Sequence, residues 1–211
     1  MITLHRCWFP VALLLVLSGC AATLRPWDCS DSVQNPIYQE NDEWVWRTTT
    51  GHETAERVGW LDEGNVYFYT SLDGEQIGQK GIQGTDEVIT MTNRLVTHSE
   101  KSWDFPLQVG KAWSYMQTSY PRGGGPMIWE QHRREVVGCE FIETPAGAFR
   151  ALKLLDTTPD DPLISYYSWY APMLKHVVKR EYVQGAPRPM TADEPGAELV
   201  RYTLQHPRDD R

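Results

Sequence analysis

Hydrophobic and polar residues alternate with a period of two along most of the chain after residue 42. Trp44 and Trp46 fall on one face of an expected strand, with Val45 and Arg47 on the other. Such alternation is typical of β-strands, because successive side chains point to opposite faces of a sheet. We expect strands near 43–47, 58–60, 66–70, 88–97, 113–118, 128–137, 141–144, 149–155, 164–170, 177–183 and 199–204. No segment has a convincing helical stripe, although a short helix fits within 98–112.

Turn residues separate the expected strands at short intervals. Gly, Asn and Asp mark 61–65 and 72–75, and the sequence Thr-Pro-Ala-Gly-Ala-Phe of 144–149 predicts a tight hairpin. Proline presets φ there, and glycine tolerates a positive φ. Many short strands joined in this way predict a mainly β domain. The expected architecture is a single antiparallel, strongly curved sheet or open barrel of about ten strands.

The glycines at 78, 81 and 84 stand three residues apart in a polar stretch. A phosphate-binding loop would need a strand before them and a helix after them. No helical pattern follows, so we interpret them as glycine-marked strand ends and bulges.

The first residues of the chain have the layout of a signal peptide. His5 and Arg6 precede an apolar run, which ends in Leu17-Ser18-Gly19-Cys20. This ending resembles the lipobox of bacterial lipoproteins. The resemblance implies removal of residues 1–19, a diacylglycerol on the Cys20 sulfur and a further acyl chain, such as palmitate, on its amine. Ala21 replaces the Asp that commonly signals inner-membrane retention, which favours the outer membrane, facing the periplasm.

The sequence then predicts four parts. Residues 1–19 form the signal peptide, and 20–42 form a lipidated N-terminus and tether with prolines and no periodicity. Residues 43–205 form the β-domain, and 206–211 form a C-terminal tail. No composition shift indicates a second domain.

Four cysteines occur in the sequence, and lipoprotein processing accounts for two of them. Cys7 leaves with the signal peptide, and Cys20 carries the acyl chains. Cys29 and Cys139 remain in an oxidising compartment and are the candidate disulfide pair. Spacing alone does not establish the bond, because pairing depends on the separation of the Cα atoms.

Charge argues against one class of partner. The chain of 211 residues has 20 basic and 28 acidic side chains and a net charge of -8. Nucleic-acid binding needs clustered Lys and Arg, and no such cluster is present. The sequence therefore predicts no nucleic-acid partner.

No catalytic, cofactor or metal motif is complete. Residues 52–56 begin like a zinc-protease helix, but Glu56 stands where the second His is required. The chain lacks a Gly-x-Ser-x-Gly elbow and a Cys-x-x-Cys pair. Glu130 with Glu135, or with Asp156, could supply a carboxylate pair, although a chain with 28 acidic residues always offers some such pair. We therefore expect no cofactor and no metal, and we favour a protein that is not an enzyme.

Several turns and strand starts resemble a group of uncharacterised bacterial envelope proteins and lipoproteins, domains of unknown function of which some are named TapB-like. The motifs are Phe-Pro-Leu-x-Val-Gly-Lys-x-Trp at 105–113, Pro-Ala-Gly-x-Phe at 145–149, Trp-Tyr-Ala-Pro at 169–172 and Val-Lys-Arg-Glu at 178–181. The match covers about 105–204 and departs at Met173-Leu174-Lys175, where the group tends to have a glycine turn. It implies a curved antiparallel sheet related to the open barrels of lipoprotein-localisation factors, which bind acyl chains in an apolar cavity.

The leading hypothesis is a membrane-anchored, non-enzymatic lipoprotein that binds a hydrophobic ligand or another envelope component through its curved sheet. Candidate aromatic residues for the ligand face are Trp44, Trp46, Trp113, Trp129, Tyr167 and Trp169, and the alternative for each is the hydrophobic core. Two other functions stay open. One is a structural or assembly accessory that docks a protein partner, and the other is a hydrolase that acts on envelope glycans.

Overall fold

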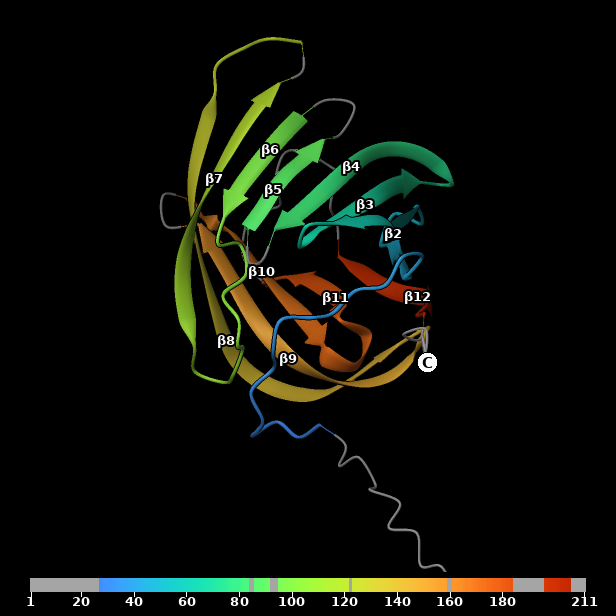
Figure 1. Cartoon of the computed structure of the whole chain (residues 1–211). Coiled ribbons are helices and arrows are strands. Elements are labelled where there is room, and N and C mark those ends of the chain that lie inside the picture. The colour runs from blue at the N-terminus through green and yellow to red at the C-terminus, as the bar shows by residue number, and fades with distance from the viewer. Residues whose placement is uncertain are drawn as a thin grey trace, which may run out of the picture.

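A single antiparallel sheet coils around to form the whole domain (Figure 1). The structure is a computed structural model, and it describes residues 27–83, 86–91, 95–121, 123–158, 161–183 and 196–205. The strands within these residues are β1 (Glu43–Thr48), β2 (Glu53–Asp62), β3 (Asn65–Leu72), β4 (Glu75–Gln83), β5 (Asp86–Met91), β6 (Leu95–Glu100), β7 (Ala112–Pro121), β8 (Ile128–Thr144), β9 (Gly147–Thr158), β10 (Asp161–Ala171), β11 (His176–Tyr182) and β12 (Ala197–Thr203). One 3-10 turn, η1 (Pro172–Leu174), joins β10 to β11.

Neighbouring strands in the sequence are also neighbours in the sheet, and the ring closes between the first and last strands. β1 pairs with β2 through Trp44 and Glu56, and with β12 through Trp44 and Tyr202. The ladder between β11 and β12 holds two residue pairs, so the curved sheet is nearly open at that point. The predicted mainly β, single antiparallel and strongly curved architecture is confirmed.

The long hairpin of β8 and β9 curls beneath the other strands (Figure 1). Its tip lies against β12, where the Ala146 N–H donates to the Leu199 carbonyl at 3.1 Å. The Phe149 ring meets Tyr202 edge-on, with the ring centroids 6.1 Å apart. The hairpin predicted at 144–149 is therefore present, and it covers one end of the barrel.

The described part of the N-terminal segment, residues 27–42, runs along the barrel and not away from it (Figure 1). Val33 forms a backbone bridge with Leu107, and the Tyr38 hydroxyl donates to the Lys175 carbonyl at 3.2 Å. Cys29 and Cys139 are joined by a disulfide. These contacts fix the segment from Trp27 onward.

Two clusters of buried side chains make up the core. The first is Trp44, Trp46, Val58, Phe68, Phe149, Ala151, Trp169, Ala171, Leu174, Val178 and Leu199. The second is Val33, Leu107, Val136, Leu152, Leu154 and Tyr170. The second cluster lies under the N-terminal segment, so that segment helps to exclude water from it.

The segment in which a short helix fits the sequence is not helical. β6 ends at Glu100, and residues 101–111 form a loop that contains a cis peptide bond before Pro106. No helix in the described part of the chain is long and apolar enough to cross a bilayer.

Candidate functional site

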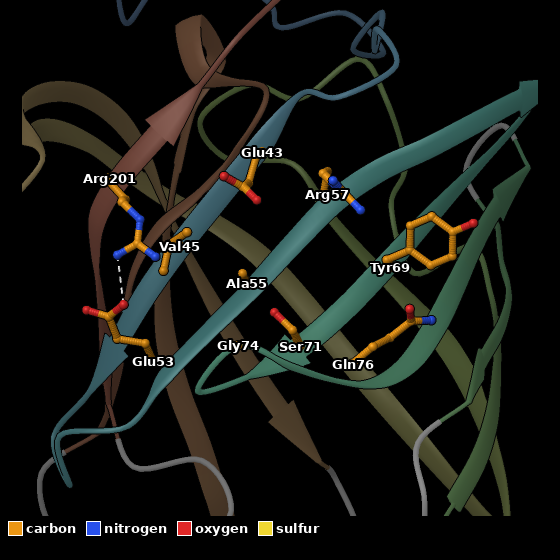
Figure 2. Close-up of a pocket in the computed structure, with 10 residues that line it drawn as sticks. All are labelled: Glu43, Val45, Glu53, Ala55, Arg57, Tyr69, Ser71, Gly74, Gln76 and Arg201. Carbon is orange, nitrogen blue, oxygen red and sulfur yellow. Dashed lines mark hydrogen bonds and ion pairs between the residues drawn. The ribbon is translucent and has the colours of Figure 1, made fainter.

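A groove of about 380 Å³ crosses five strands of the sheet (Figure 2). Small side chains make its floor. Val45, Ala55 and Ser71 lie opposite one another on β1, β2 and β3, because the register pairs Val45 with Ala55 and Ala55 with Ser71. Arg201 lies beside Val45 at one end, and Gln76 lies beside Ser71 at the other. We call this hollow the cross-strand groove.

Larger side chains stand on both sides of the floor. One wall lies two residues along each strand from the floor residues. There the register places Glu43 opposite Arg57 and Arg57 opposite Tyr69. On the other side of the floor stands Glu53 (Figure 2). The strand period of two therefore builds the groove, because side chains on the same face form parallel rows across the sheet.

Glu53 is held in place by two arginines. Its carboxylate accepts hydrogen bonds from Arg47 at 2.9 Å and Arg201 at 2.7 Å. These bonds hold the pKa of Glu53 below its ordinary value. Glu53 therefore stays ionised and acts as an acceptor, not as a general acid.

The opposite wall has the charged side chains of Glu43 and Arg57. Neither Glu43 nor Arg57 forms an ion pair with a described residue, although the Arg57 guanidinium lies 5.8 Å from the centre of the Tyr69 ring. Glu43, Glu53, Arg57 and Arg201 together bring two negative and two positive charges to the groove. This balance suits a neutral polar ligand better than an ion.

Tyr69 is positioned by a glycine on the neighbouring strand. A Cβ atom at Gly59 would lie 2.5 Å from Cε2 of Tyr69, so the ring occupies the space that a side chain would need. Gly59 is also the extra residue of a bulge, between Val58 and Trp60. The missing side chain therefore lets the Tyr69 ring lie against β2.

A second group of polar residues lies inside the barrel. Glu56 accepts hydrogen bonds from Lys80 at 2.5 Å and from His176 Nε2 at 3.1 Å. The Val177 N–H donates to His176 Nδ1, which leaves the ring proton on Nε2. The His176 ring contacts both Trp44 and Trp46, with ring centroids 4.7 Å apart in each case.

The electrostatics of this internal group favour a stable ion pair over proton transfer. Although burial alone would raise the pKa of Glu56, Lys80 and His176 hold it far below the ordinary value. Burial lowers the pKa of His176, and the bond to Glu56 offsets part of that effect. Glu56 is then ionised and His176 neutral at pH 7, so neither is poised as a general acid.

A third polar group, Arg134 and Asp156, lies deeper in the barrel. Arg134 forms an ion pair with Asp156 and also donates to the Ser102 carbonyl at 2.7 Å. His132 stacks on Tyr115 next to this pair, with the centroids 5.0 Å apart. Glu130 and Glu135, the other candidates for a carboxylate pair with Asp156, instead lie near His132 and Arg133 respectively. The structure therefore does not bring these three carboxylates together as a catalytic set.

Within the described residues, no three His, Cys, Asp or Glu side chains gather as a metal site would require. A second hollow of about 280 Å³ has Arg47, Lys179 and Glu198 among its lining residues, and more of its exposed lining is apolar than polar. The first hollow, the cross-strand groove, is lined mainly by polar atoms, which does not suit an acyl chain.

The six aromatic candidates for a ligand face do not form one surface. Trp44, Trp46 and Trp169 are buried in the first core cluster, and Tyr167 packs against it. Trp113 packs against the second cluster, whereas 62% of the Trp129 surface is exposed. The indole N–H groups of Trp44 and Trp46 donate to the Leu174 and Val177 carbonyls. Their role toward a ligand stays a prediction, and their contacts are those of core residues.

Cys20, the predicted lipidation site, lies outside the described residues. Cys29 and Cys139, the candidate disulfide pair, have Cα atoms 5.7 Å apart and are bonded. The bond joins the N-terminal segment to the middle of β8 across a sequence separation of 110 residues.

Sequence reasoning missed the cross-strand groove and the group of Glu56, Lys80 and His176. The residues of both sets come from separate strands, and no spacing rule links them. The one available signal was register: once β1, β2 and β3 are paired, the small residues Val45, Ala55 and Ser71 fall in a row.

Comparisons with known proteins support the fold. A scan of family models finds no match. A search of curated proteins also finds no similar sequence. Among solved structures, the chain is similar to a Bacteroides fragilis protein described as exported and as having a YmcC-like fold. That likeness has a TM-score of 0.52 and 16% identity, and it covers 82% of this chain and 100% of that one.

The hypothetical lipoprotein YmcC from Escherichia coli is a second similar structure. Its TM-score is 0.50 and its identity 9%, over 80% of this chain and 86% of that chain. At such identities the likeness concerns the fold alone, and this chain has a YmcC-like fold. The TapB-like name and the kinship with lipoprotein-localisation factors stay predictions.

Proposed function

We propose that this chain is a bacterial envelope lipoprotein, anchored through acyl chains on Cys20, which binds a glycan in the cross-strand groove without converting it. The lipobox at residues 17–20 supports the anchor, and the outer membrane, facing the periplasm, is the proposed site. Two proteins of similar fold are described as exported or as a lipoprotein, which supports the coarser location in the cell envelope.

The observation that carries the proposal is the composition of the groove. A half-buried tyrosine ring offers an apolar face with a polar tip, and carboxylate, guanidinium, amide and hydroxyl groups surround it. Sugars present alternating C–H faces and hydroxyl groups, so they need both kinds of contact. The balanced charges favour neutral sugar units over a strongly charged ligand.

The state of two carboxylates, Glu53 and Glu56, supports binding without catalysis. A glycoside hydrolase needs one carboxylic acid whose pKa is raised, so that it can protonate the leaving oxygen. The pKa of Glu53 is lowered in the groove, and that of Glu56 is lowered inside the barrel. Neither residue meets the requirement, which supports the non-enzymatic hypothesis over the hydrolase.

The test is titration with oligosaccharides released from bacterial envelopes, monitored by calorimetry. Ser71→Trp places a large side chain on the groove floor and should abolish binding. Ser114→Trp, on β7 and away from the groove, is the matched control and should bind as the unmodified chain does. Equal binding by all three proteins would contradict the groove as the glycan site.

The anchor is tested separately. Membrane-extracted protein should give an N-terminal Cys20 peptide with the mass of its acyl chains, and Cys20→Ala should move the protein out of the membrane fraction. An N-terminus without acyl mass would contradict the anchor and leave the glycan titration unaffected.

An exposed apolar surface favours one alternative, an accessory that docks a protein partner. Met116, Tyr120, Met127 and Trp129 are 40–62% exposed at the end of the β7–β8 hairpin, and we call them the tip patch. A photocrosslinker at position 129 should capture one dominant envelope protein in intact cells under this alternative.

A further inference from the structure

Three exposed apolar side chains lie close to the place where the lipid anchor leaves the domain. Phe141, Val109 and Val137 are 69%, 48% and 39% exposed. We call them the anchor-side strip. Exposed side chains of this size normally mark a contact surface when they gather in one region.

Val137 and Phe141 belong to β8, and Val109 belongs to the loop before β7. The Gly110 N–H donates to the Val136 carbonyl at 2.8 Å, which brings the loop containing Val109 beside Val137. Four residues further along β8, Phe141 lies opposite Arg150, whose guanidinium is 4.7 Å from the centre of its ring.

Arg150 joins the strip to the first described residues of the chain. Its Nη1 donates to the Trp27 carbonyl at 3.3 Å and lies 3.6 Å from a carboxylate oxygen of Asp28. The disulfide between Cys29 and Cys139 fixes this arrangement two residues further on.

The chain between the anchor and this point is short. Cys20 and Trp27 are seven residues apart, so even a fully extended chain spans at most about 25 Å. The acyl chains of Cys20 lie in the bilayer, and the bilayer surface is therefore within that distance of Trp27. The tip patch is far from this point, because Phe141 and Trp129 are twelve residues apart, or about 40 Å along β8.

We propose that the anchor-side strip rests on the bilayer that holds the acyl chains of Cys20, and so fixes which side of the barrel faces the membrane. This inference rests on the proposed anchor and is independent of the glycan site. The strip has the chemistry for an interfacial contact, because an aromatic and two aliphatic side chains enter the boundary between headgroups and acyl chains. The chain is acidic overall, so anionic headgroups do not attract it and the apolar contact supplies the attraction.

Photocrosslinking to lipid tests the contact directly. The full-length lipidated protein is reconstituted in vesicles of phosphatidylethanolamine and phosphatidylglycerol, with p-benzoylphenylalanine at position 141, 109 or 129 in turn. All three positions are exposed, so each variant should retain the fold, and position 129 serves as the matched control. We expect lipid adducts at 141 and 109 in about tenfold greater yield than at 129.

Two results would overturn the inference. Adduct yields at 141 and 109 no higher than at 129 would show that this side does not face the lipid. A Cys20 peptide without acyl mass would remove the anchor and the inference with it. The two failures are distinguishable, because the first occurs in protein whose acylation has been verified by mass spectrometry.

Discussion

Arg134 and Asp156 form an ion pair inside the barrel, with Arg134 Nε 2.5 Å from Asp156 Oδ1. Both side chains are almost fully buried. Trp103 and Tyr115 lie beside the guanidinium, with ring centres 4.7 and 5.4 Å away. The carboxylate outweighs the effect of burial and raises the pKa of Arg134, so the arginine stays charged in the interior.

Removing one partner of this pair should be strongly destabilising. Asp156→Ala leaves an unpaired buried guanidinium, and we expect the free energy of unfolding to fall by about 3–5 kcal/mol. Urea denaturation measures this change. Glu135→Ala breaks an exposed ion pair with Arg133 on the same strand and should cost less than about 1 kcal/mol. Equal losses in the two variants would contradict the buried pair as a source of stability.

Acid should destabilise the domain through two histidines before its carboxylates titrate. Burial lowers the pKa of His176 and of His132 below the unfolded value of about 6.5. The unfolded chain then binds more protons than the folded one below that pH, so stability falls as the pH falls from 7 to 5. The slope should reach at most about 1.4 kcal/mol per pH unit for each histidine.

The measurement is urea denaturation at several pH values in that window. His176→Gln and His132→Gln should each flatten the slope by removing one titrating group. An unchanged slope in both variants would show that other groups cause the acid sensitivity.

Gly59→Ala should disturb the groove wall more than the fold. The new Cβ would lie 2.5 Å from the Tyr69 ring, and the ring can move away because it belongs to a side chain. We expect a loss of about 1–3 kcal/mol in stability and a displaced ring in the crystal structure. Gly138→Ala is the control, because nothing lies within 4 Å of its added Cβ. A Tyr69 ring that stays in place would refute this account of Gly59.

The disulfide should contribute to stability as well as fix the N-terminal segment. Cys29→Ser with Cys139→Ser removes a bond that closes a loop of 110 residues, and we expect a loss of about 2–5 kcal/mol. Protease treatment of the folded variant should also cut within residues 27–36, where the oxidised protein resists. Resistance equal to that of the oxidised protein would show that Val33 and Tyr38 hold the segment without the bond.

Periodicity predicted most strands because it reports which face is buried. It missed β4, whose residues include Gly78, Gly81 and Lys80 and whose inward lysine joins the pair with Glu56. A polar interior gives no alternation of apolar and polar residues. The single segment expected near 88–97 is divided between β5 and β6, and the segments near 128–137 and 141–144 form the continuous strand β8. The gap expected between these two segments is bridged, because a bulge between Val136 and Gly138 lets the strand continue.

The candidate site was less predictable than the fold. The groove depends on residues from five strands, and its floor exists because Val45, Ala55 and Ser71 are small at matching positions. The sequence pattern of one strand shows which of its side chains are buried. A groove depends instead on which side chains of several strands lie opposite one another in the sheet. The aromatic candidates show the same limit, because Trp44 and Trp169 are prominent in the sequence and lie in the core, which was the stated alternative for each of them.

The pairing of β1 with β12 has a consequence for the chain before it is complete. The β1–β12 ladder forms only after β12, the last strand, is available to the folding chain, whereas Trp44 and Trp46 donate to the Leu174 and Val177 carbonyls, which come before that strand. Until then β1 presents an unpaired edge, which can pair with other chains. In the proposed envelope location, a chaperone that covers this edge would act on the newly exported chain, and a chain cut before residue 197 would remain its client.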